Sequence, residues 1–363
     1  MTTAHVTCPS IARAEHRITT DEICDDIERA QSGLPRLGAM LRYARRTQVA
    51  TRRFTRPLSH PAIAGDAPIG ERNRIAFEDS ARLAVQAAKQ ALAGARLTAD
   101  DVDCVVTSHT TSWTVPGLDI HLIEELGLRP GIKRIPMSTL GCVGGAHALV
   151  RAADHVAARP ADTVLVVVAE MLSTVYNHHD TTPQSVIYKT LFGDSAAACL
   201  VTGSPLGPGL RIDDTWEYVL PQSRDRYRGR LDAHGLHFDS ETTATQAVND
   251  LMPALQLYLK QQGIEQPDFV VLHPGGPRIL HDMETGLNIE QPDADAGGHL
   301  SRHAWATLRE DGNLGGPAVL AVLARTHQDP PPPDSRGILL GVGPGFSAAA
   351  CTTTWKGEQN TLG

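Results

Sequence analysis

The feature that most constrains the fold of this chain is an internal repeat. Three blocks from its first half recur in the same order in its second half. The paired blocks are DVDCVVTSH (101–109) with QPDFVVLHP (266–274), STLGCVGGAHALVRAADHV (138–156) with REDGNLGGPAVLAVLARTH (309–327), and ADTVLVVVAE (161–170) with SRGILLGVGP (335–344). Each half therefore follows the order strand, helix, glycine-rich turn into a helix, strand. The alternative is a chance likeness between two helices rich in Ala, Val and Leu.

An alternation of short apolar strands with helices predicts right-handed crossovers and a mostly parallel sheet in each half. Two such α/β halves are expected to pack face to face, with helices enclosed between two sheets. We place the boundary after residue 212, so that one half spans residues 1–212 and the other spans residues 213–363.

Local patterns outside the repeat carry predictions of their own. Residues 18–46 are expected to be largely helical, with Thr20 or Asp21 as the N-cap, because a short polar side chain satisfies the free amides of a first helical turn. The stretch 55–75 is rich in Pro and Gly and predicts a loop. A long amphipathic helix is expected after it, over residues 79–95.

The composition argues against several classes of protein. Hydrophobic residues make up 41% of the 363 residues and charged residues 20%, an ordinary globular balance that disfavours disorder. A net charge of −8 disfavours a general attraction to nucleic acid or to an anionic membrane. The sequence contains no apolar run long enough to predict a membrane span, and its N-terminus lacks the apolar stretch of a secretory signal.

The six cysteines form no CxxC pair and no dense cluster. Neither a structural metal site nor a disulfide framework is therefore expected. A reduced, cytoplasmic setting is the default expectation. One of the six cysteines has unusual surroundings.

The repeat places Cys142 opposite Asn313, in the turns GCVGG (141–145) and GNLGG (312–316). Each turn leads into a helix, and in a duplicated fold the two helix ends are expected to come close together. The positive end of a helix dipole favours a thiolate. The flanking glycines are expected to let a substrate approach the backbone. A small core cysteine beside a tight turn is the alternative.

His273 is the third candidate for the site. It follows an apolar strand in VVLHPGGP (270–277), and the carboxyl ends of parallel strands form the crevice in which α/β proteins bind ligands. A surface turn histidine is the alternative, because the chain has 16 histidines. Cys142, His273 and Asn313 together indicate acyl transfer: an imidazolium favours the thiolate, and the imidazole and amide N–H groups stabilise an enolate or oxyanion. Asn313 does not titrate, and we expect it to leave thiolate formation unaffected.

Six motifs resemble those of the type III polyketide synthases, the chalcone-synthase-like branch of the thiolase superfamily. They are STLGCVGGAHAL (138–149), LFGDSAAA (191–198), GLHF (235–238), FVVLHPGGPRIL (269–280), LREDGNLGG (308–316) and GVGPG (341–345). The resemblance implies a five-layered αβαβα fold built from two duplicated halves, in a homodimer. It implies Cys142 as the acyl-accepting nucleophile, in the first half of the chain. It also implies His273 and Asn313, in the second half, as the groups that promote decarboxylation of malonyl-CoA.

The same resemblance implies which residues surround the nucleophile. Phe192 and Phe238 match two gatekeeper phenylalanines, for which plain core packing is the alternative. The other cavity positions that it implies are Thr110, Trp113, Val115, Leu172, Val175, Gly315, Gly343 and Pro344. Gly315 stands where the plant enzymes commonly have Ser, so the starter preference of the plant enzymes does not transfer. The positions implied for binding coenzyme A are Arg42, Arg46, Gly275 and Arg278.

The leading interpretation is an iterative condensing enzyme that extends an acyl group on Cys142 with malonyl-CoA and cyclises the chain to a small aromatic or pyrone. The starter is an acyl-CoA, with malonyl-CoA itself among the candidates, and no cofactor is implied. A single-condensation enzyme or acyltransferase similar to ketoacyl synthase III is the second interpretation. A cysteine protease leaves the duplicated turns unexplained. A non-catalytic coenzyme A-binding subunit would be expected to lose Cys142 or Asn313, and both are present.

Overall fold

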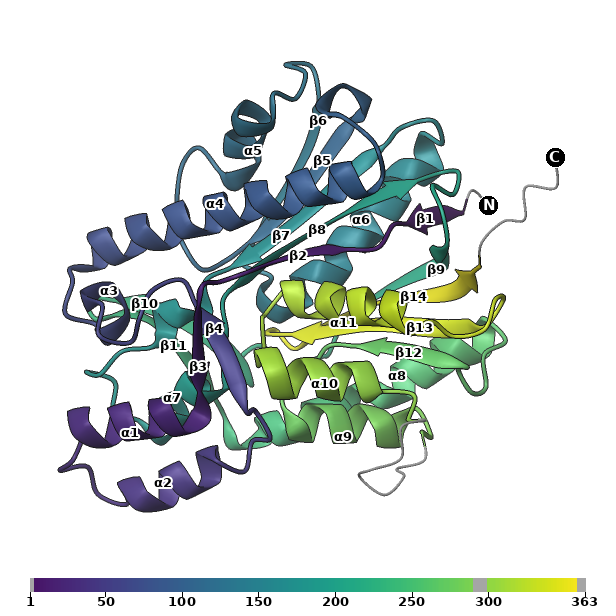
Figure 1. The fold of residues 1–363 in the computed structure, drawn as a ribbon. Coiled ribbons are helices and arrows are strands. Elements are labelled where there is room, and N and C mark those ends of the chain that lie inside the picture. The colour runs from purple at the N-terminus through teal and green to yellow at the C-terminus, as the bar shows by residue number, and fades with distance from the viewer. Residues whose placement is uncertain (1–2, 290–298, 358–363) are drawn as a thin grey trace.

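The structure, a computed structural model, describes residues 3–289 and 299–357 (Figure 1). The strands are β1 Ala4–Val6, β2 Ser10–Arg13, β3 His16–Thr19, β4 Thr51–Phe54, β5 Cys104–His109, β6 Lys133–Ser138, β7 Val164–Glu170, β8 Ser195–Thr202, β9 Gly209–Val219, β10 Tyr227–Asp232, β11 Gly235–Ser240, β12 Phe269–Leu272, β13 Arg336–Gly343 and β14 Ser347–Lys356. The α-helices are α1 Thr20–Ala30, α2 Leu37–Ala44, α3 Pro61–Ala64, α4 Ile69–Gly94, α5 Leu118–Leu126, α6 Gly144–Ala158, α7 Pro183–Leu191, α8 Ala247–Gln261, α9 Pro277–Gly286, α10 Arg302–Asp311 and α11 Pro317–Gln328. Short 3-10 turns lie at η1 Ala99–Asp101, η2 Gly141–Val143, η3 Leu172–Val175 and η4 Thr242–Gln246. None of the helices described is long and apolar enough to cross a membrane.

The repeated blocks form equivalent elements, as the sequence predicts. β5 corresponds to β12, α6 to α11, and β7 to β13. The parallel pairing of β5 with β7 recurs as the parallel pairing of β12 with β13. The structure is therefore a duplicated α/β fold.

The sheets differ from the prediction in two respects. Hydrogen bonds join the strands of both halves into one sheet, in the order β12-β13-β14-β9-β1-β8-β7-β5-β6, with β2 paired to β8. The prediction of mostly parallel sheets is wrong, because only three strand pairs among the described residues are parallel. The antiparallel pairs arise where a short connection reverses the chain, as between β13 and β14, which only residues 344–346 separate.

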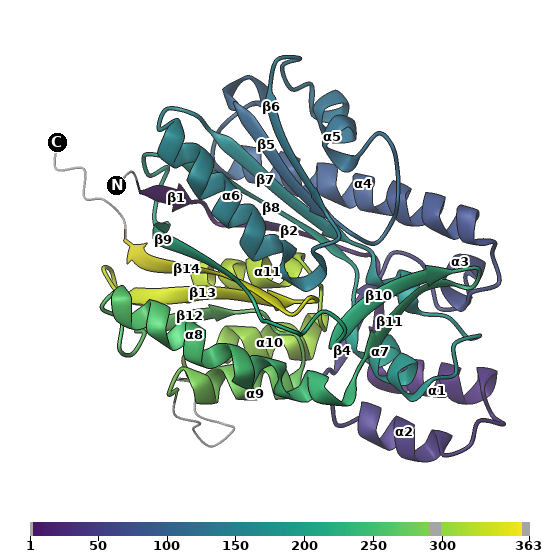
Figure 2. The same cartoon turned by 180° about the vertical axis from the view of Figure 1, so that it is seen from behind.

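The two halves of this sheet face each other across α6 and α11 (Figures 1 and 2). α6 contacts β5 and β7 of the first half and β13 and β14 of the second, while α11 contacts β8 and β12. On the outside, α4 covers β7 and β8, and α8 packs on β9 through Tyr258, whose ring stacks on that of Trp216. The result is the layered arrangement that the family resemblance implies.

Glycines allow α6 and α11 to touch. A Cβ atom added at Gly145 would lie 2.2 Å from the carbonyl oxygen of Gly316, and one added at Gly144 would lie 2.3 Å from the hydroxyl of Ser108. These glycines therefore serve close packing within the protein. The prediction that the flanking glycines let a substrate approach the backbone is therefore wrong for Gly144 and Gly145, which face protein atoms.

Local predictions near the N-terminus need two corrections. The N-cap of α1 is Thr19, one residue before the predicted Thr20 or Asp21, because Thr19 and Glu22 form a reciprocal capping box. The loop predicted over 55–75 contains α3 and the start of α4, which begins at Ile69, ten residues earlier than expected from 79–95. The polar first turns of α4 concealed its start.

The hairpin of β10 and β11 stands beside the sheet, with α7 packed against β11 (Figure 1). Successive residues of each strand alternate between an inner and an outer face, because a strand is pleated. Residues that lie opposite each other in an antiparallel pair point to the same face. Tyr227 pairs with Ser240, and Gly229 with Phe238, on the inner face. The turn of the hairpin is fastened at the carbonyl oxygen of His234, which accepts hydrogen bonds at 2.6 Å from Arg72 Nη1 and from Asn177 Nδ2. The other N–H groups of that buried guanidinium donate to further backbone carbonyls.

Because the Gly145 site faces rigid backbone, we expect Gly145→Ala to lower the free energy of unfolding by roughly 1–3 kcal/mol or more. Gly70→Ala in α4 is the matched control, because an added Cβ there meets no atom within 4 Å and alanine favours a helix. Urea unfolding followed by circular dichroism compares the two variants. Equal stability of both would contradict the packing role of Gly145.

Candidate active site

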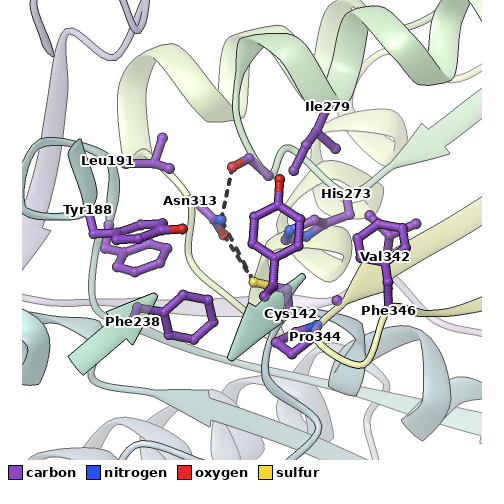
Figure 3. A pocket seen from close by; sticks show the side chains of 14 residues that line it. Cys142, Tyr188, Leu191, Phe238, His273, Ile279, Asn313, Val342, Pro344 and Phe346 are labelled. Carbon is purple, nitrogen blue, oxygen red and sulfur yellow. Dashed lines mark hydrogen bonds between the residues drawn. The ribbon is translucent and has the colours of Figure 1, made fainter. Parts of the chain in front are cut away.

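Cys142 lies in η2, directly before α6, at the place that the repeat predicts. The turn is fixed on one side by Thr110, whose hydroxyl accepts a hydrogen bond of 3.1 Å from the N–H of Gly141. On the other side Gly343 packs against it, since a Cβ there would lie 2.8 Å from the backbone nitrogen of Val143. The residue as a whole is partly exposed, and its side chain borders a cavity (Figure 3).

Asn313 is held in one orientation beside this sulfur. Its Oδ1 accepts a hydrogen bond of 2.8 Å from the N–H of Gly315, and its Nδ2 donates to the carbonyl of Gly275 at 3.2 Å. The same Nδ2 lies 3.8 Å from Cys142 Sγ, within hydrogen-bond distance for sulfur (Figure 3). The amide therefore presents an N–H group to the reactive sulfur. Its backbone is fixed as well, because its N–H donates to Leu191.

His273 follows the carboxyl end of β12, as predicted, and its side chain lines the same cavity. Its backbone N–H donates to the carbonyl of Leu340 at 2.9 Å, which continues the parallel pairing with β13. The ring is buried, and its Nδ1 has no hydrogen-bond partner within the described ranges. This burial lowers the pKa of His273 to about 3.

Burial also governs Cys142. Desolvation raises the pKa of its thiol to about 12, the charge of Glu170 acts in the same direction, and the hydrogen bond from Asn313 acts against it. Burial therefore disfavours the charged forms of both the cysteine and the histidine in the free protein, which opposes formation of the expected thiolate–imidazolium pair. We expected Asn313 to leave thiolate formation unaffected, but its hydrogen bond lowers the pKa of the Cys142 thiol and so favours the thiolate.

Aromatic side chains line the cavity next to Cys142. Phe192 and Phe238 contact each other edge to face with ring centroids 5.7 Å apart, and both contact Tyr188, at 5.2 and 5.3 Å. Both predicted gatekeepers, together with Gly343 and Pro344, line this cavity. Sequence reasoning missed Tyr188, Tyr227 and Phe346. The signal for Tyr188 was its place one helical turn before Phe192.

A second cavity adjoins the first. Five residues line both: Tyr188, Leu191, Tyr227, Gly275 and Ile279. The outer cavity also has Arg46 and Arg278 in its wall, whereas Arg42 is exposed on α2 and lines neither. Three of the four predicted coenzyme A positions therefore border a passage that leads to Cys142.

Six predicted cavity residues do not line the cavity at Cys142. Trp113 and Val115 are exposed, at 75% and 79%, on the loop before α5. Leu172 and Val175 are buried in the hydrophobic core. Thr110 lies behind the turn of Cys142, and a Cβ at Gly315 would touch Leu172 at 3.2 Å.

Glu170 is a buried carboxyl group behind the site that sequence reasoning missed. Its Oε2 accepts hydrogen bonds from the backbone N–H groups of Thr110 and Thr111, at 3.3 and 3.1 Å, while Oε1 is buried without a partner among the described residues. Burial raises its pKa to about 8, so it is largely protonated at neutral pH. An acidic residue that ends the apolar strand TVLVVVAE was the available signal. No group of three or more potential metal ligands occurs in the described part of the chain.

Comparisons with known proteins identify the family. Residues 10–205 match the family of chalcone and stilbene synthases in its N-terminal domain, and residues 211–352 match it in its C-terminal domain. The chain belongs to this family. It is 33% identical to 1,3,6,8-tetrahydroxynaphthalene synthase of Streptomyces coelicolor over 96% of this chain and 91% of that protein. It is 29% identical to phloroglucinol synthase of Pseudomonas fluorescens over 96% of this chain and 98% of that protein.

Solved structures place the chain among the type III polyketide synthases. The crystal structure of the S. coelicolor tetrahydroxynaphthalene synthase superposes with a TM-score of 0.91 at 30% identity and covers 97% of this chain and 99% of that chain. Germicidin synthase from the same organism superposes with a TM-score of 0.88 at 31% identity, over 98% and 100% of the two chains. The thiolase-like fold and the polyketide synthase family are thereby confirmed.

Because Asn313 donates towards the sulfur, we expect Asn313→Ala to shift alkylation of Cys142 by iodoacetamide to higher pH, by about 1–2 pH units. The rate is measured on the Cys142 peptide by mass spectrometry, in a Cys8→Ser background, because Cys8 is also exposed. Asn249→Ala, on the exposed surface of α8, is the control. An unchanged pH profile for Asn313→Ala would show that its amide does not stabilise the thiolate.

Glu170 supplies a pH-dependent prediction. The pKa of its carboxyl group is about 8 in the folded protein and 4.5 when the group is exposed. As the pH rises, the unfolded chain therefore loses the carboxyl proton before the folded protein does. The free energy of unfolding consequently falls between these two pH values, by up to roughly 1.4 kcal/mol per pH unit. Glu170→Gln cannot ionise and escapes this loss. Its free energy of unfolding relative to the natural protein should therefore rise from pH 5 to pH 8 in urea titrations. Glu28→Gln on the exposed surface of α1 should show no such trend.

Proposed function

We propose that this polyketide synthase builds its product on Cys142, by iterative decarboxylative condensation of malonyl-CoA onto an acyl-CoA starter, and closes the chain to a small aromatic or pyrone. The observation that carries the proposal is the meeting of Cys142, His273 and Asn313 at one cavity. The similarity to tetrahydroxynaphthalene and phloroglucinol synthases supports an aromatic product. The second candidate, a single condensation, has no specific contact in its favour.

Acyl loading begins with a neutral thiol. The proton of Cys142 passes to the neutral imidazole of His273, and Asn313 Nδ2 stabilises the resulting thiolate. The sulfur attacks the carbonyl carbon of the acyl-CoA, its acyl group moves to Cys142, and the coenzyme A thiolate leaves and takes up a proton.

Extension requires an enolate. When malonyl-CoA loses CO₂, the electron pair of the broken bond moves onto the thioester oxygen, and N–H groups of His273 and Asn313 donate to it. The apolar walls formed by Phe192 and Phe238 favour loss of the charged carboxylate. The enolate carbon then attacks the acyl group on Cys142, and the sulfur is released for the next round.

The passage from the outer cavity supports binding of the coenzyme A thioesters. Arg46 and Arg278 lie in its wall, where Arg278 is paired with Asp282 at 2.7 Å. Arg42, which is exposed on α2 four residues before Arg46, adds a further cation. No cofactor enters these steps, since coenzyme A is carried by the substrates.

A homodimer is part of the proposal. β6 is an edge strand of the sheet, and Trp113 and Val115 project from a neighbouring loop. Large exposed apolar side chains beside an open sheet edge favour association with a second copy of the chain. Light scattering measures this association.

Two further predictions from the sequence remain predictions. One is the division of the chain into residues 1–212 and 213–363. The other is a cytoplasmic setting, which the six free cysteines support.

With malonyl-CoA alone, the protein should release CO₂, and Asn313→Ala should slow this release by roughly 10²–10³-fold, because one oriented donor to the enolate is lost. Cys142→Ala should abolish both the acyl adduct seen by intact-mass analysis and chain extension. Cys8→Ser is the matched control and should behave like the natural protein. An acyl adduct on Cys104 or Cys199 instead would overturn the assignment of the nucleophile.

A further inference from the structure

We infer that the hydroxyl of Tyr227 binds the pantetheine arm of the incoming thioester, by donating a hydrogen bond to the carbonyl oxygen of the amide nearest the thioester sulfur. The inference rests on the proposed function and extends it to the part of the substrate that the passage to Cys142 recognises. It concerns a residue that no motif in the sequence singled out.

Tyr227 stands where the two cavities meet. It begins β10, points to the inner face of the hairpin with Phe238, and lines both the cavity at Cys142 and the outer cavity. Arg46 and Arg278 line the outer cavity, whereas Cys142 lines the inner one. A thioester that is held by its coenzyme A end in the outer cavity and reacts at Cys142 therefore passes Tyr227.

The two cavities share five residues, and only two of these have polar side chains. These two are Tyr188 and Tyr227. The hydroxyl of Tyr188 already interacts with the side chain of Ser240. The hydroxyl of Tyr227 makes no hydrogen bond to any residue that the structure describes. Among the described residues that the cavities share, Tyr227 therefore supplies the free hydroxyl.

The phenol of Tyr227 lies near groups of both cavities. Burial first, and then the charges of Cys142 in the inner cavity and Asp282 in the outer one, raise the pKa of Tyr227 to about 12. The hydroxyl consequently keeps its proton at neutral pH and can donate a hydrogen bond. Its ring contacts that of Phe346, with centroids 5.8 Å apart, so packing fixes the place of the hydroxyl.

A pantetheine arm brings a matching acceptor to this place. Four bonds separate the thioester sulfur from the carbonyl carbon of the nearest amide, which is about 5 Å in an extended chain. When the thioester carbon touches Cys142, this amide therefore lies further out, at the level of the residues that the cavities share. An amide that enters a passage with mostly apolar walls loses its hydrogen bonds to water, and a hydrogen bond from Tyr227 compensates for that loss.

Two variants isolate this hydroxyl. Tyr227→Phe removes the hydroxyl and keeps the ring that packs on Phe346. Tyr218→Phe on β9 is the matched control, because it makes the same chemical change in a residue that lines neither cavity. Circular dichroism checks that both variants fold like the natural protein.

The experiment measures kcat and KM for CO₂ release by the full-length protein from three malonyl thioesters. Malonyl-CoA and malonyl-N-acetylcysteamine contain the amide, whereas the malonyl thioester of butanethiol lacks it. Tyr227→Phe should raise KM for the first two by roughly 2- to 10-fold, the range that one neutral hydrogen bond supplies. Its kcat should stay unchanged, because the amide is bound equally in the ground state and the transition state. Neither variant should change KM for the butyl thioester, and Tyr218→Phe should match the natural protein throughout.

Two results would overturn the inference. One is an unchanged KM of Tyr227→Phe for the two thioesters that contain the amide. The other is an equal rise in KM for the butyl thioester, which would assign the hydroxyl to the malonyl group instead of the arm. A truncated thioester that is not turned over is measured as a competitive inhibitor of malonyl-CoA, and its inhibition constant then takes the place of KM. If the natural protein releases no CO₂ from malonyl-CoA, the proposed function itself is wrong.

Discussion

The contact between α6 and α11 is the constraint on which the site depends. Because Gly145 leaves no side chain between the helices, the carbonyl of Gly316 approaches the backbone of α6 directly. The turns that precede these two helices carry Cys142 and Asn313, so the approach of the helices sets the distance between sulfur and amide. One half of the duplication thus supplies the nucleophile, and the other supplies the donor beside it.

Desolvation is the second determinant. The same burial raises the pKa of Cys142, lowers that of His273 and raises that of Glu170. All three effects disfavour the charged forms of these groups. Such a site strengthens each hydrogen bond that forms when a negative oxygen or sulfur develops in it. Desolvation of the resting groups and stabilisation of developing charge thus have one cause.

The sequence was informative where a pattern recurs and weak where contacts are long-range. The repeat predicted the equivalence of β5 with β12 and of α6 with α11, since each block keeps its apolar periodicity. It did not predict the antiparallel pairs, because strand direction is decided by short connections such as residues 344–346. Cys142, His273 and Asn313 were found from motifs. The raised pKa of Cys142 could not be predicted from the sequence, because a helix end is visible in a sequence and burial is not. Tyr227 has no motif, and only the pairing of β10 with β11 turns it towards the cavity.

The fastening of the β10–β11 hairpin has a consequence for substitutions along its strands. Arg72 and Asn177 hold the hairpin at the backbone carbonyl of His234, and a carbonyl is present whatever side chain stands there. The hairpin keeps its position even when the residues along its strands change. Its inner face is thus an exchangeable wall on a fixed frame, on which single substitutions reshape the reaction chamber while the machinery that makes the carbon–carbon bond stays as it is.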